Sequence, residues 1–506
     1  MFRFRLSCAS GVLALSLTLI GAGSRADEHA ATAVEGVGEP LSFVSAGSGC
    51  FGGTRIDYRV EAGEMHLVNG AGEPTAALFS TAYIAEDAGP DRPVTFVWNG
   101  GPGSASVWLH MGVLGPRRVR VASEADSDDG APPYPIEDNP DTILDVSDLV
   151  FVDPIGVGFS RVIGDGDSAD YWGQAGDTDS LVQFIRRWVT EHGRWNAPRF
   201  IIGESFGTTR AAAVADALHG GGQDMALSGI VMISQAMDYT GSTPSPDNLI
   251  AYVTYLPSMA ATAWYHDPDT NKPSLEAVVA RARAFATETY LPALFKGSGL
   301  AGDDRREVAV ELAELLRLDL EYVLRANLRV TVPRFTKELL RAEGLAVGRL
   351  DSRYTLDDPD DNAATPRMGD PASLAIGSAY TAALMTHFAA LGVRVDRPYL
   401  TSNRAVGRDW NYETGPGSSG GEPAYVNTAR ALSAAMRKNG DLRVLVANGY
   451  YDLITPFFDA EYTFGRHEIP MNRVSMTYYR AGHMMYVRDA DFEALLADIR
   501  AFYGAP

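Results

Sequence analysis

The chain has 506 residues, of which 46% are hydrophobic and 21% charged, and its formal net charge is −21. This length and apolar content suit a globular protein with a substantial core, built as one large domain with an insertion or as two or three smaller ones. The negative charge argues against a nucleic-acid-binding protein and gives no sign of a surface that seeks anionic lipid. A soluble secreted protein fits this composition better.

The first 26 residues have the pattern of a signal peptide. Arg3 and Arg5 give a basic start, residues 12–20 are apolar, and Ser24-Arg25-Ala26 is a small-x-small cleavage signal. The apolar stretch is too short for a comfortable membrane span, and no later stretch has the required length and apolarity. We therefore expect an exported protein, periplasmic or secreted, with no membrane span after signal removal; an uncleaved N-terminal anchor is the alternative.

Two cysteines are present, and only Cys50 lies outside the signal. A single cysteine cannot form an internal disulfide, so stability must come from core packing even in an oxidising compartment. Because no base lies near Cys50 in the sequence, we predict a structural thiol and not a catalytic one.

The order of the predicted elements is typical of an α/β fold with a mostly parallel central sheet. Residues 27–53 are mostly small and polar, and we predict a flexible N-terminal segment there. Alternating apolar residues then predict antiparallel strands at 55–61, 65–68 and 78–84. Later apolar runs predict buried strands, and helical periodicity predicts helices between them. These strands lie at 93–98, 149–153, 199–202, 227–233, 443–447 and 474–479, and the helices at 177–191, 208–218, 425–438 and 491–502.

Residues 240–410 interrupt this alternation. They carry helical patterns, and an insertion above strand ends would form a largely helical cap or lid that shapes a pocket. The core would then consist of residues 54–239 and 411–506, joined through a Gly- and Ser-rich connection at 400–424.

A G-x-S-x-G motif, Gly203-Glu204-Ser205-Phe206-Gly207, stands between a predicted strand and a predicted helix. In this context the motif predicts a nucleophile elbow, where small residues let the chain turn sharply and expose the serine. The motif could also arise by chance, so its partners decide the interpretation.

The partners of the serine are predicted to be Asp452 and His483. A serine hydroxyl needs a base to take its proton, and the base needs a third group to hold its tautomer. Asp452 and His483 follow Ser205 in the order of the α/β-hydrolase triad, and each lies just past the end of a predicted strand. Of nine histidines, His483 is the only one that closely follows a strand and a glycine near the C-terminus. Asp459 is the alternative acid, and we prefer Asp452 because it lies at the end of a predicted strand.

A glycine-rich turn, Asn99-Gly100-Gly101-Pro102-Gly103, follows the strand at 93–98. Such a turn lets a backbone N–H approach a substrate oxygen closely. An α/β-hydrolase places half of its oxyanion hole here and takes the other half from the residue after the nucleophile. The predicted donors are the N–H groups of Gly101 and Phe206; a tight structural turn is the alternative.

With these motifs the chain resembles the serine carboxypeptidase family, which includes carboxypeptidase Y and cathepsin A, in its bacterial exported branch. The matching stretches are WNGGPG at 98–103, DPIGVGFS at 153–160, GESFG at 203–207, NGYYD at 448–452 and GHM at 482–484. The resemblance implies an α/β-hydrolase fold and an enzyme that releases C-terminal amino acids from peptides through an acyl-enzyme. The insertion at 240–400 matches only loosely.

The resemblance also implies a binding site for the substrate's terminal carboxylate, formed by Asn99 and a protonated Glu204. Two carboxyl groups in contact are favoured when one of them holds a proton, so such enzymes favour acidic pH. Some relatives carry a second glutamate where Val113 stands here, which weakens the expectation of a strongly acidic optimum. A structural role at the elbow is the alternative for Glu204. Trp108 and Met484 are candidates for the pocket of the leaving residue.

We expect no metal and no cofactor, because His467-Glu468 lacks a second histidine at the spacing of a zinc motif. The expected partners are peptides with a free C-terminus, without nucleic acid, and a homodimer stays open. An esterase or acyltransferase on the same fold, or a non-catalytic hydrolase-like binding protein, are the alternative functions.

Overall fold

The structure is a computed structural model that describes residues 37–86, 88–125, 130–412 and 425–504. The predicted signal peptide at 1–26 and residues 413–424 of the predicted Gly- and Ser-rich connection lie outside the described residues. Gly36–Pro506 forms one compact unit. No helix in the described ranges is long and apolar enough to cross a membrane.

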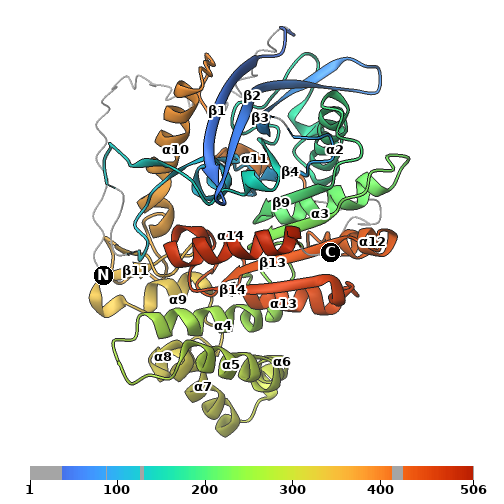
Figure 1. The fold of residues 1–506 in the computed structure, drawn as a ribbon. Helices are drawn as coiled ribbons and strands as arrows, with labels where there is room; N and C mark the ends of the chain where they lie inside the picture. The colour runs from blue at the N-terminus through green and yellow to red at the C-terminus, as the bar shows by residue number, and fades with distance from the viewer. Residues whose placement is uncertain (1–36, 87, 126–129, 413–424, 505–506) are drawn as a thin grey trace, which may run out of the picture. The chain divides into compact units, whose positions relative to one another are not determined.

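A central sheet of ten strands organises the fold (Figure 1). Nine strands follow one another in the order β1-β2-β3-β7-β4-β9-β10-β13-β14, and β8 pairs with β3. The pairs among β1, β2, β3 and β7 are antiparallel, whereas every pair from β7 to β14 is parallel. The strands are β1 (Ser42–Phe51), β2 (Thr54–Val68), β3 (Pro74–Ala85), β4 (Val94–Trp98), β7 (Asp148–Val152), β8 (Arg161–Val162), β9 (Arg199–Glu204), β10 (Gly229–Ile233), β13 (Arg443–Gly449) and β14 (Val474–Tyr479).

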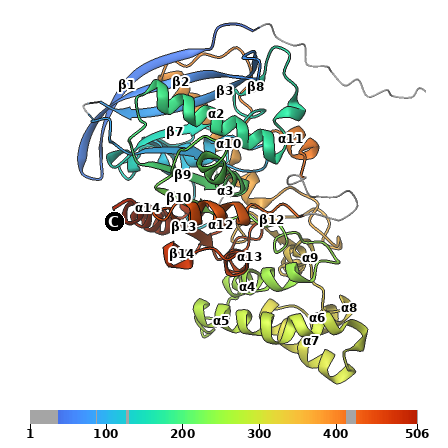
Figure 2. The same cartoon turned by 90° about the vertical axis from the view of Figure 1, so that its right-hand side faces the viewer.

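Both faces of the parallel strands are buried, because helices cover each side. Ile201 of β9 and Met232 of β10 pack in one hydrophobic cluster with α2, α3 and α12. The neighbouring residues Ile202 and Ile233 point the other way and pack with α10 and α14. Figure 2 shows α2, α3 and α12 along one face of the sheet. These helices are α2 (Gln174–Glu191), α3 (Phe206–His219), α10 (Pro371–Ala390), α12 (Ala429–Lys438) and α14 (Asp489–Gly504).

The region predicted as a cap is mostly helical and has a hydrophobic core of its own. Leu256, Phe285, Leu312 and Phe335 belong to this second core, and α4 contacts α13 beside the sheet (Figures 1 and 2). Its boundaries at 240 and 410 stay a prediction, and α10 packs in the core of the sheet instead. Besides α10, the helices of this region are α4 (Leu249–Tyr265), α5 (Leu275–Phe285), α6 (Leu291–Lys296), α7 (Gly302–Leu316), α8 (Leu320–Arg325), α9 (Val332–Glu338) and α11 (Arg404–Asp409), whereas α13 (Phe457–Arg466) lies beyond it in the chain.

Several short elements lie outside the main sheet and its helices. A helical turn, α1, leads into a π-helical turn, η1, after the glycine-rich loop, and two hairpins lie outside the main sheet. Their bounds are α1 (Val107–Leu109), η1 (His110–Leu114), β5 (Arg117–Val119), β6 (Ile136–Asp138), β11 (Leu345–Val347) and β12 (Thr355–Asp357).

The prediction of a flexible segment at 27–53 is wrong for residues 42–51, which form β1 and pair with β2. Small residues in this strand weaken the alternation of apolar and polar residues that would reveal it in the sequence. A Cβ on Gly47 would overlap the ring of Tyr58, and a Cβ on Gly49 would overlap the ring of Phe51. The glycines are therefore needed so that aromatic rings can lie against the edge strand. Cys50 is a free cysteine and is exposed on the same strand.

Two of the predicted early strands, 55–61 and 65–68, are one continuous strand, β2. The buried strands were predicted within a few residues of their ends, and β14 has the predicted bounds. The α/β-hydrolase fold is confirmed: a mostly parallel sheet carries helices on both faces and a helical insertion follows β10.

Candidate active site

The sharp turn at Ser205 is built as the motif predicts. β9 ends at Glu204, α3 begins at Phe206, and Ser205 between them has φ 59° and ψ −129°. This backbone conformation is costly for a residue with a side chain, about 1–3 kcal/mol, and is typical of functional sites. A Cβ on Gly203 would overlap the carbonyl of Gly207, so the motif glycines are required by close backbone packing.

Asp452 and His483 meet at the carboxyl ends of β13 and β14. The Nδ1 atom of His483 lies 2.7 Å from Oδ2 of Asp452, and both side chains are buried. A carboxylate only accepts hydrogen bonds, so Nδ1 donates and the imidazole is held in the tautomer that leaves Nε2 free to act as a base. Asp459, the competing acid, is buried on α13 next to Asp238, so Asp452 is the partner of His483.

The carboxylate of Asp452 is itself held in place by the residues that follow it. Its Oδ1 accepts from the N–H groups of Ile454 (2.7 Å) and Thr455 (2.9 Å). Its Oδ2 also accepts from the hydroxyl of Thr455 at 2.7 Å. Ser234 donates to the carbonyl of His483 at 2.7 Å, so the histidine backbone is fixed as well.

Ser205 and His483 line the same cavity, of about 530 Å³, although no hydrogen bond among those of the described residues joins their side chains. Apo hydrolases often show long contacts here that tighten with substrate. Burial alone would lower the pKa of His483, but the charge and hydrogen bond of Asp452, with the charge of Glu204, raise this pKa above its usual value.

The glycine-rich loop after β4 lies directly against the elbow. A Cβ on Gly100 would overlap the backbone nitrogen of Phe206, so only glycine permits this approach. Phe206 is the first residue of α3, and its N–H therefore has no acceptor within the helix. Gly101 and Ser205 both line the cavity. The two predicted oxyanion donors thus lie on segments that are packed together beside the serine.

Glu204 and Asn99, the predicted carboxylate-binding pair, contact each other. Nδ2 of Asn99 donates to Oε1 of Glu204 at 2.9 Å, and the hydroxyl of Tyr486 donates to Oε2 at 2.6 Å. Leu109, in the turn before η1, donates its N–H to Oδ1 of Asn99 at 3.1 Å, which fixes the orientation of the amide. All three polar side chains are buried.

Burial raises the pKa of the Glu204 carboxyl to about 7. The charge of His483 and the hydrogen bonds from Tyr486 and Asn99 lower this pKa, but desolvation outweighs them. Glu204 is therefore largely protonated at acidic pH and can donate a hydrogen bond to an anion.

The other predicted pocket residues, Trp108 and Met484, also line the cavity. Trp108 donates its indole N–H to Ser104 at 2.9 Å, and its ring contacts Tyr380 of α10. Val113 lies in η1 with a fully buried side chain and is not among the residues that line the cavity.

Sequence reasoning missed several residues of this site. Tyr486 lies only three residues after His483, and Thr455 three after Asp452, so proximity to the motifs was the available signal. Arg210 was a clearer signal, because it is an arginine directly before an apolar run, residues 211–215, in the helix that follows the serine. It is fully buried and donates to the carbonyl groups of Asn99 (2.7 Å) and Gly100 (3.3 Å).

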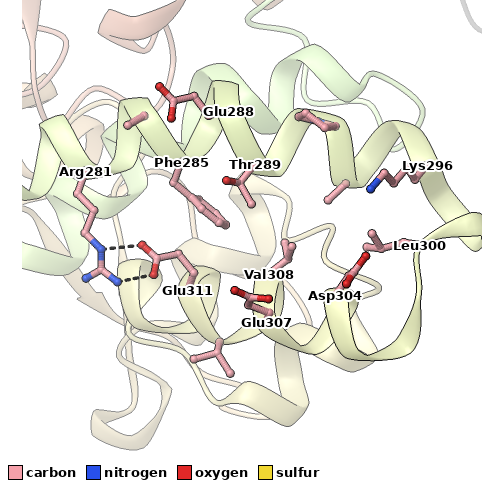
Figure 3. A pocket seen from close by; sticks show the side chains of 14 residues that line it. Arg281, Phe285, Glu288, Thr289, Lys296, Leu300, Asp304, Glu307, Val308 and Glu311 are labelled. Carbon is pink, nitrogen blue, oxygen red and sulfur yellow. Dashed lines mark hydrogen bonds and ion pairs between the residues drawn. The ribbon is translucent and has the colours of Figure 1, made fainter.

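A larger hollow, of about 770 Å³, lies between the α5–α6 segment and α7 (Figure 3). Figure 3 shows Arg281 with two contacts to Glu311, and charged side chains line much of the remaining wall. The lining contains no serine, cysteine or histidine. Its size alone does not make it the reactive site, and the smaller cavity holds Ser205 and His483, the predicted nucleophile and base.

Comparison with known proteins gives one family match. The model of the serine carboxypeptidase family matches residues 61–263, a stretch that includes Asn99 and Ser205 but ends before Asp452 and His483. No curated protein sequence matches the chain.

Many solved structures are similar to the described chain. The proline iminopeptidase of Mycobacterium smegmatis is 14% identical with a TM-score of 0.37, covering 87% of this chain and 98% of that chain. MGS-M2, an α/β hydrolase from a Medee basin deep-sea metagenome library, is 10% identical with a TM-score of 0.34, covering 85% and 95%. Esterase E22 is 13% identical with a TM-score of 0.33, covering 92% and 100%.

These structural likenesses are weak, and the strand order and the position of the elbow identify the fold. The family match confirms the resemblance that the motifs indicate. The chain therefore resembles the serine carboxypeptidase family over residues 61–263 and has the α/β-hydrolase fold.

Proposed function

We propose that the protein is a serine carboxypeptidase that releases the C-terminal amino acid of peptides. The observation that carries this proposal is the contact between Glu204 and Asn99 in the wall of the cavity that contains Ser205. A simple esterase needs a nucleophile, a base and an oxyanion hole, but it has no need of a protonated carboxyl group next to the nucleophile.

In the proposed reaction, the Oγ of Ser205 attacks the carbonyl carbon of the last peptide bond while Nε2 of His483 takes its proton. Asp452 stabilises the imidazolium that forms, through the hydrogen bond to Nδ1. The oxyanion of the tetrahedral intermediate accepts hydrogen bonds from the N–H groups of Gly101 and Phe206. The C–N bond then breaks, and His483 gives its proton to the leaving amino group.

A water molecule completes the cycle. His483 takes a proton from this water, whose oxygen attacks the acyl carbon, and a second tetrahedral intermediate forms. The ester bond to Ser205 breaks, the serine recovers a proton from His483, and the shortened peptide leaves with a new carboxyl group.

Recognition of the free C-terminus is assigned to Asn99 and Glu204. Two ionised carboxylates in contact repel each other, whereas a protonated Glu204 can donate a hydrogen bond to the carboxylate of the substrate. A pKa of about 7 keeps Glu204 protonated over the acidic range. Substrate binding should therefore weaken as the pH rises through this value.

The two titrating groups limit activity from opposite sides. His483 must be neutral to accept the serine proton, and its pKa is raised above the usual value, so kcat/KM increases with pH on the acidic side. Glu204 must be protonated, so kcat/KM decreases on the alkaline side. Because the two groups interact, the apparent values belong to the pair. We expect a bell-shaped profile with its maximum at mildly acidic to neutral pH.

The test is release of the C-terminal amino acid from blocked dipeptides between acidic and neutral pH, compared with the same peptides amidated at the C-terminus. Release that requires the free carboxylate and is lost in Ser205→Ala would support an exopeptidase. Equal cleavage of amidated peptides or of simple esters would show an esterase or acyltransferase. Failure of a fluorophosphonate to label the native protein would favour a binding protein without activity.

We also propose that the enzyme acts outside the cytoplasm, on the basis of residues 1–26. Mass spectrometry of the N-terminus of the mature protein, purified from a bacterial host, tests this. An N-terminus at Asp27 is the expected result, and an intact Met1 in an extracellular or periplasmic fraction would contradict signal cleavage.

A further inference from the structure

We propose that Arg210 is a positioning residue that aims the N–H of Gly101 into the oxyanion hole. This inference rests on the proposed acyl-transfer chemistry at Ser205. Arg210 lies one turn into α3, the helix that begins directly after the nucleophile, and its side chain is 1% exposed. It touches neither substrate nor serine in this role and acts through the backbone of the glycine-rich loop.

The guanidinium of Arg210 holds two successive carbonyl groups of that loop. Nη1 donates to the carbonyl oxygen of Asn99 at 2.7 Å and to that of Gly100 at 3.3 Å. The Gly100 carbonyl also accepts from the N–H of Ser104 at 3.1 Å. These two donors to one oxygen therefore fix the direction of the Gly100 carbonyl.

A fixed Gly100 carbonyl fixes the N–H of Gly101, because both belong to one peptide unit. The peptide unit is planar, and in the trans form its C=O and N–H point in opposite directions. The Gly100 oxygen points toward Arg210 and Ser104, so the Gly101 N–H points away from them. Gly101 lines the cavity with Ser205, so an N–H that points away from Arg210 and Ser104 can be directed into the cavity.

The contacts of Arg210 and Ser104 hold the Gly100–Gly101 peptide, whereas other hydrogen bonds of the loop lie further along it, such as the one from the Asn403 N–H to the Gly103 carbonyl at 2.8 Å. Glycine lacks the side chain that restricts φ and ψ, and Gly101 has φ 107°, so a peptide between two glycines could rotate readily. Gly100 must also be a glycine, since a Cβ there would overlap the backbone nitrogen of Phe206. The contact from Arg210, outside the loop, therefore adds to the Ser104 hydrogen bond in keeping the donor in place.

Arg210 is suited to this task because it is itself immobilised. Nε donates to Oδ2 of Asp177 at 2.7 Å, in a pair whose side chains are 1% and 3% exposed. The guanidinium also lies over the ring of Phe206 at 5.0 Å and that of Trp410 at 5.8 Å. A planar guanidinium can serve a carboxylate and two carbonyl groups at fixed angles, which the flexible ammonium of a lysine cannot do.

The chain offers a matched control in Arg194. This arginine is also buried, pairs with Asp148, and donates from Nη1 to the carbonyls of Gly89 (3.2 Å) and Arg92 (3.1 Å). It thus makes the same kinds of contact, but with a loop that does not line the cavity. Arg210→Lys and Arg194→Lys should lower stability by comparable amounts, whereas only the first should affect the oxyanion hole.

The experiment measures kcat and KM for a blocked dipeptide and for p-nitrophenyl acetate, the inhibition constant of a peptide aldehyde, and the midpoint of thermal unfolding. Loss of one oxyanion donor lowers kcat about 10²- to 10³-fold, so misplacement of one donor is expected to lower it ~10- to 100-fold. In Arg210→Lys we expect this loss in kcat on both substrates, KM within about threefold, and aldehyde binding weakened by a similar factor. In Arg194→Lys we expect kcat within about twofold.

A kcat loss in Arg210→Lys no larger than that in Arg194→Lys, or unchanged aldehyde binding, would overturn the proposal. If Arg210→Lys does not fold, Asp177→Asn keeps the arginine but loosens it, and a kcat equal to that of the wild type would then refute the positioning role. The ester separates this inference from the proposed function: a wild type that cleaves only the ester refutes the carboxypeptidase assignment and leaves Arg210 testable. A wild type inert to both substrates would refute both.

Discussion

Substitution of Glu204 by glutamine tests the proposed recognition of the C-terminus most directly. The amide has nearly the same shape, and it keeps both contacts of the carboxyl group, since its oxygen can accept from Asn99 and its NH₂ can donate to Tyr486. The change removes only the ability to ionise. Any pH dependence that disappears in Glu204→Gln therefore belongs to this carboxyl group.

The expected magnitude follows from the environment of Glu204. Burial raises its pKa from 4.5 to about 7, and each unit of a pKa shift corresponds to ~1.4 kcal/mol. Ionisation of this group in the folded protein is thus disfavoured by about 3 kcal/mol relative to water. With an apparent pKa near 7, kcat/KM of the wild type should fall about tenfold for each pH unit above neutrality.

The assay is kcat/KM for a blocked dipeptide with a free carboxylate, measured from pH 5 to pH 9 (a range set by ~2 units on either side of the Glu204 pKa). In Glu204→Gln the alkaline decrease should vanish, so the variant, weaker at acidic pH, overtakes the wild type at alkaline pH. p-Nitrophenyl acetate has no carboxylate and should show no such decrease in either protein. Asp459→Asn removes another buried carboxyl, one outside the cavity, and should leave the profile unchanged.

The same substitution predicts a change in stability. A carboxyl group whose pKa is raised by folding stabilises the folded state below its unfolded pKa, here 4.5, and this contribution is lost as the pH rises through 7. Glu204→Gln should therefore unfold at a higher temperature than the wild type above pH 7, but not near pH 4.5. An alkaline decrease of kcat/KM that persists in Glu204→Gln would refute the assignment of carboxylate binding to this residue.

Three further predictions concern the same cavity. Tyr486→Phe removes a hydrogen bond that favours the ionised form of Glu204, so the pKa of Glu204 should rise. The alkaline decrease of kcat/KM should then move to higher pH by about one unit, and a shift to lower pH would contradict this. Asp452→Asn should lower kcat by ~10³- to 10⁴-fold with little change in KM, because His483 loses its preferred tautomer, and a loss below about tenfold would exclude Asp452 from the triad. Among the described residues that line the cavity, Arg404 has a permanent positive charge, so Arg404→Gln should lower kcat/KM for peptides ending in glutamate, relative to glutamine, by ~3- to 10-fold. Arg408→Gln, on the same helix but paired with Asp409 at 2.7 Å, is the control, and an unchanged Glu-to-Gln ratio in Arg404→Gln would refute the preference.

Features that depend on neighbours in the chain could be predicted from the sequence. The elbow at Ser205 is encoded within five residues, because the glycines at 203 and 207 and the flanking strand and helix are all local. The triad order and the positions of Asp452 and His483 after strands β13 and β14 were also accessible, since apolar runs reveal buried strands. The edge strand β1 could not be predicted, because its residues are mostly small and its alternation of apolar and polar residues is weak.

The environment of each reactive group was decided only by the tertiary structure. Glu204 contacts Tyr486 across a separation of 282 residues, and Arg210 contacts Gly100 across 110. Such contacts depend on strand order and on the packing of α3 against the glycine-rich loop, which no local pattern specifies. The same holds for the pKa of Glu204, which results from complete burial. The sequence by itself determined which residues can react, because their motifs are local, whereas the three-dimensional packing decided how those residues are held, hydrogen-bonded and charged.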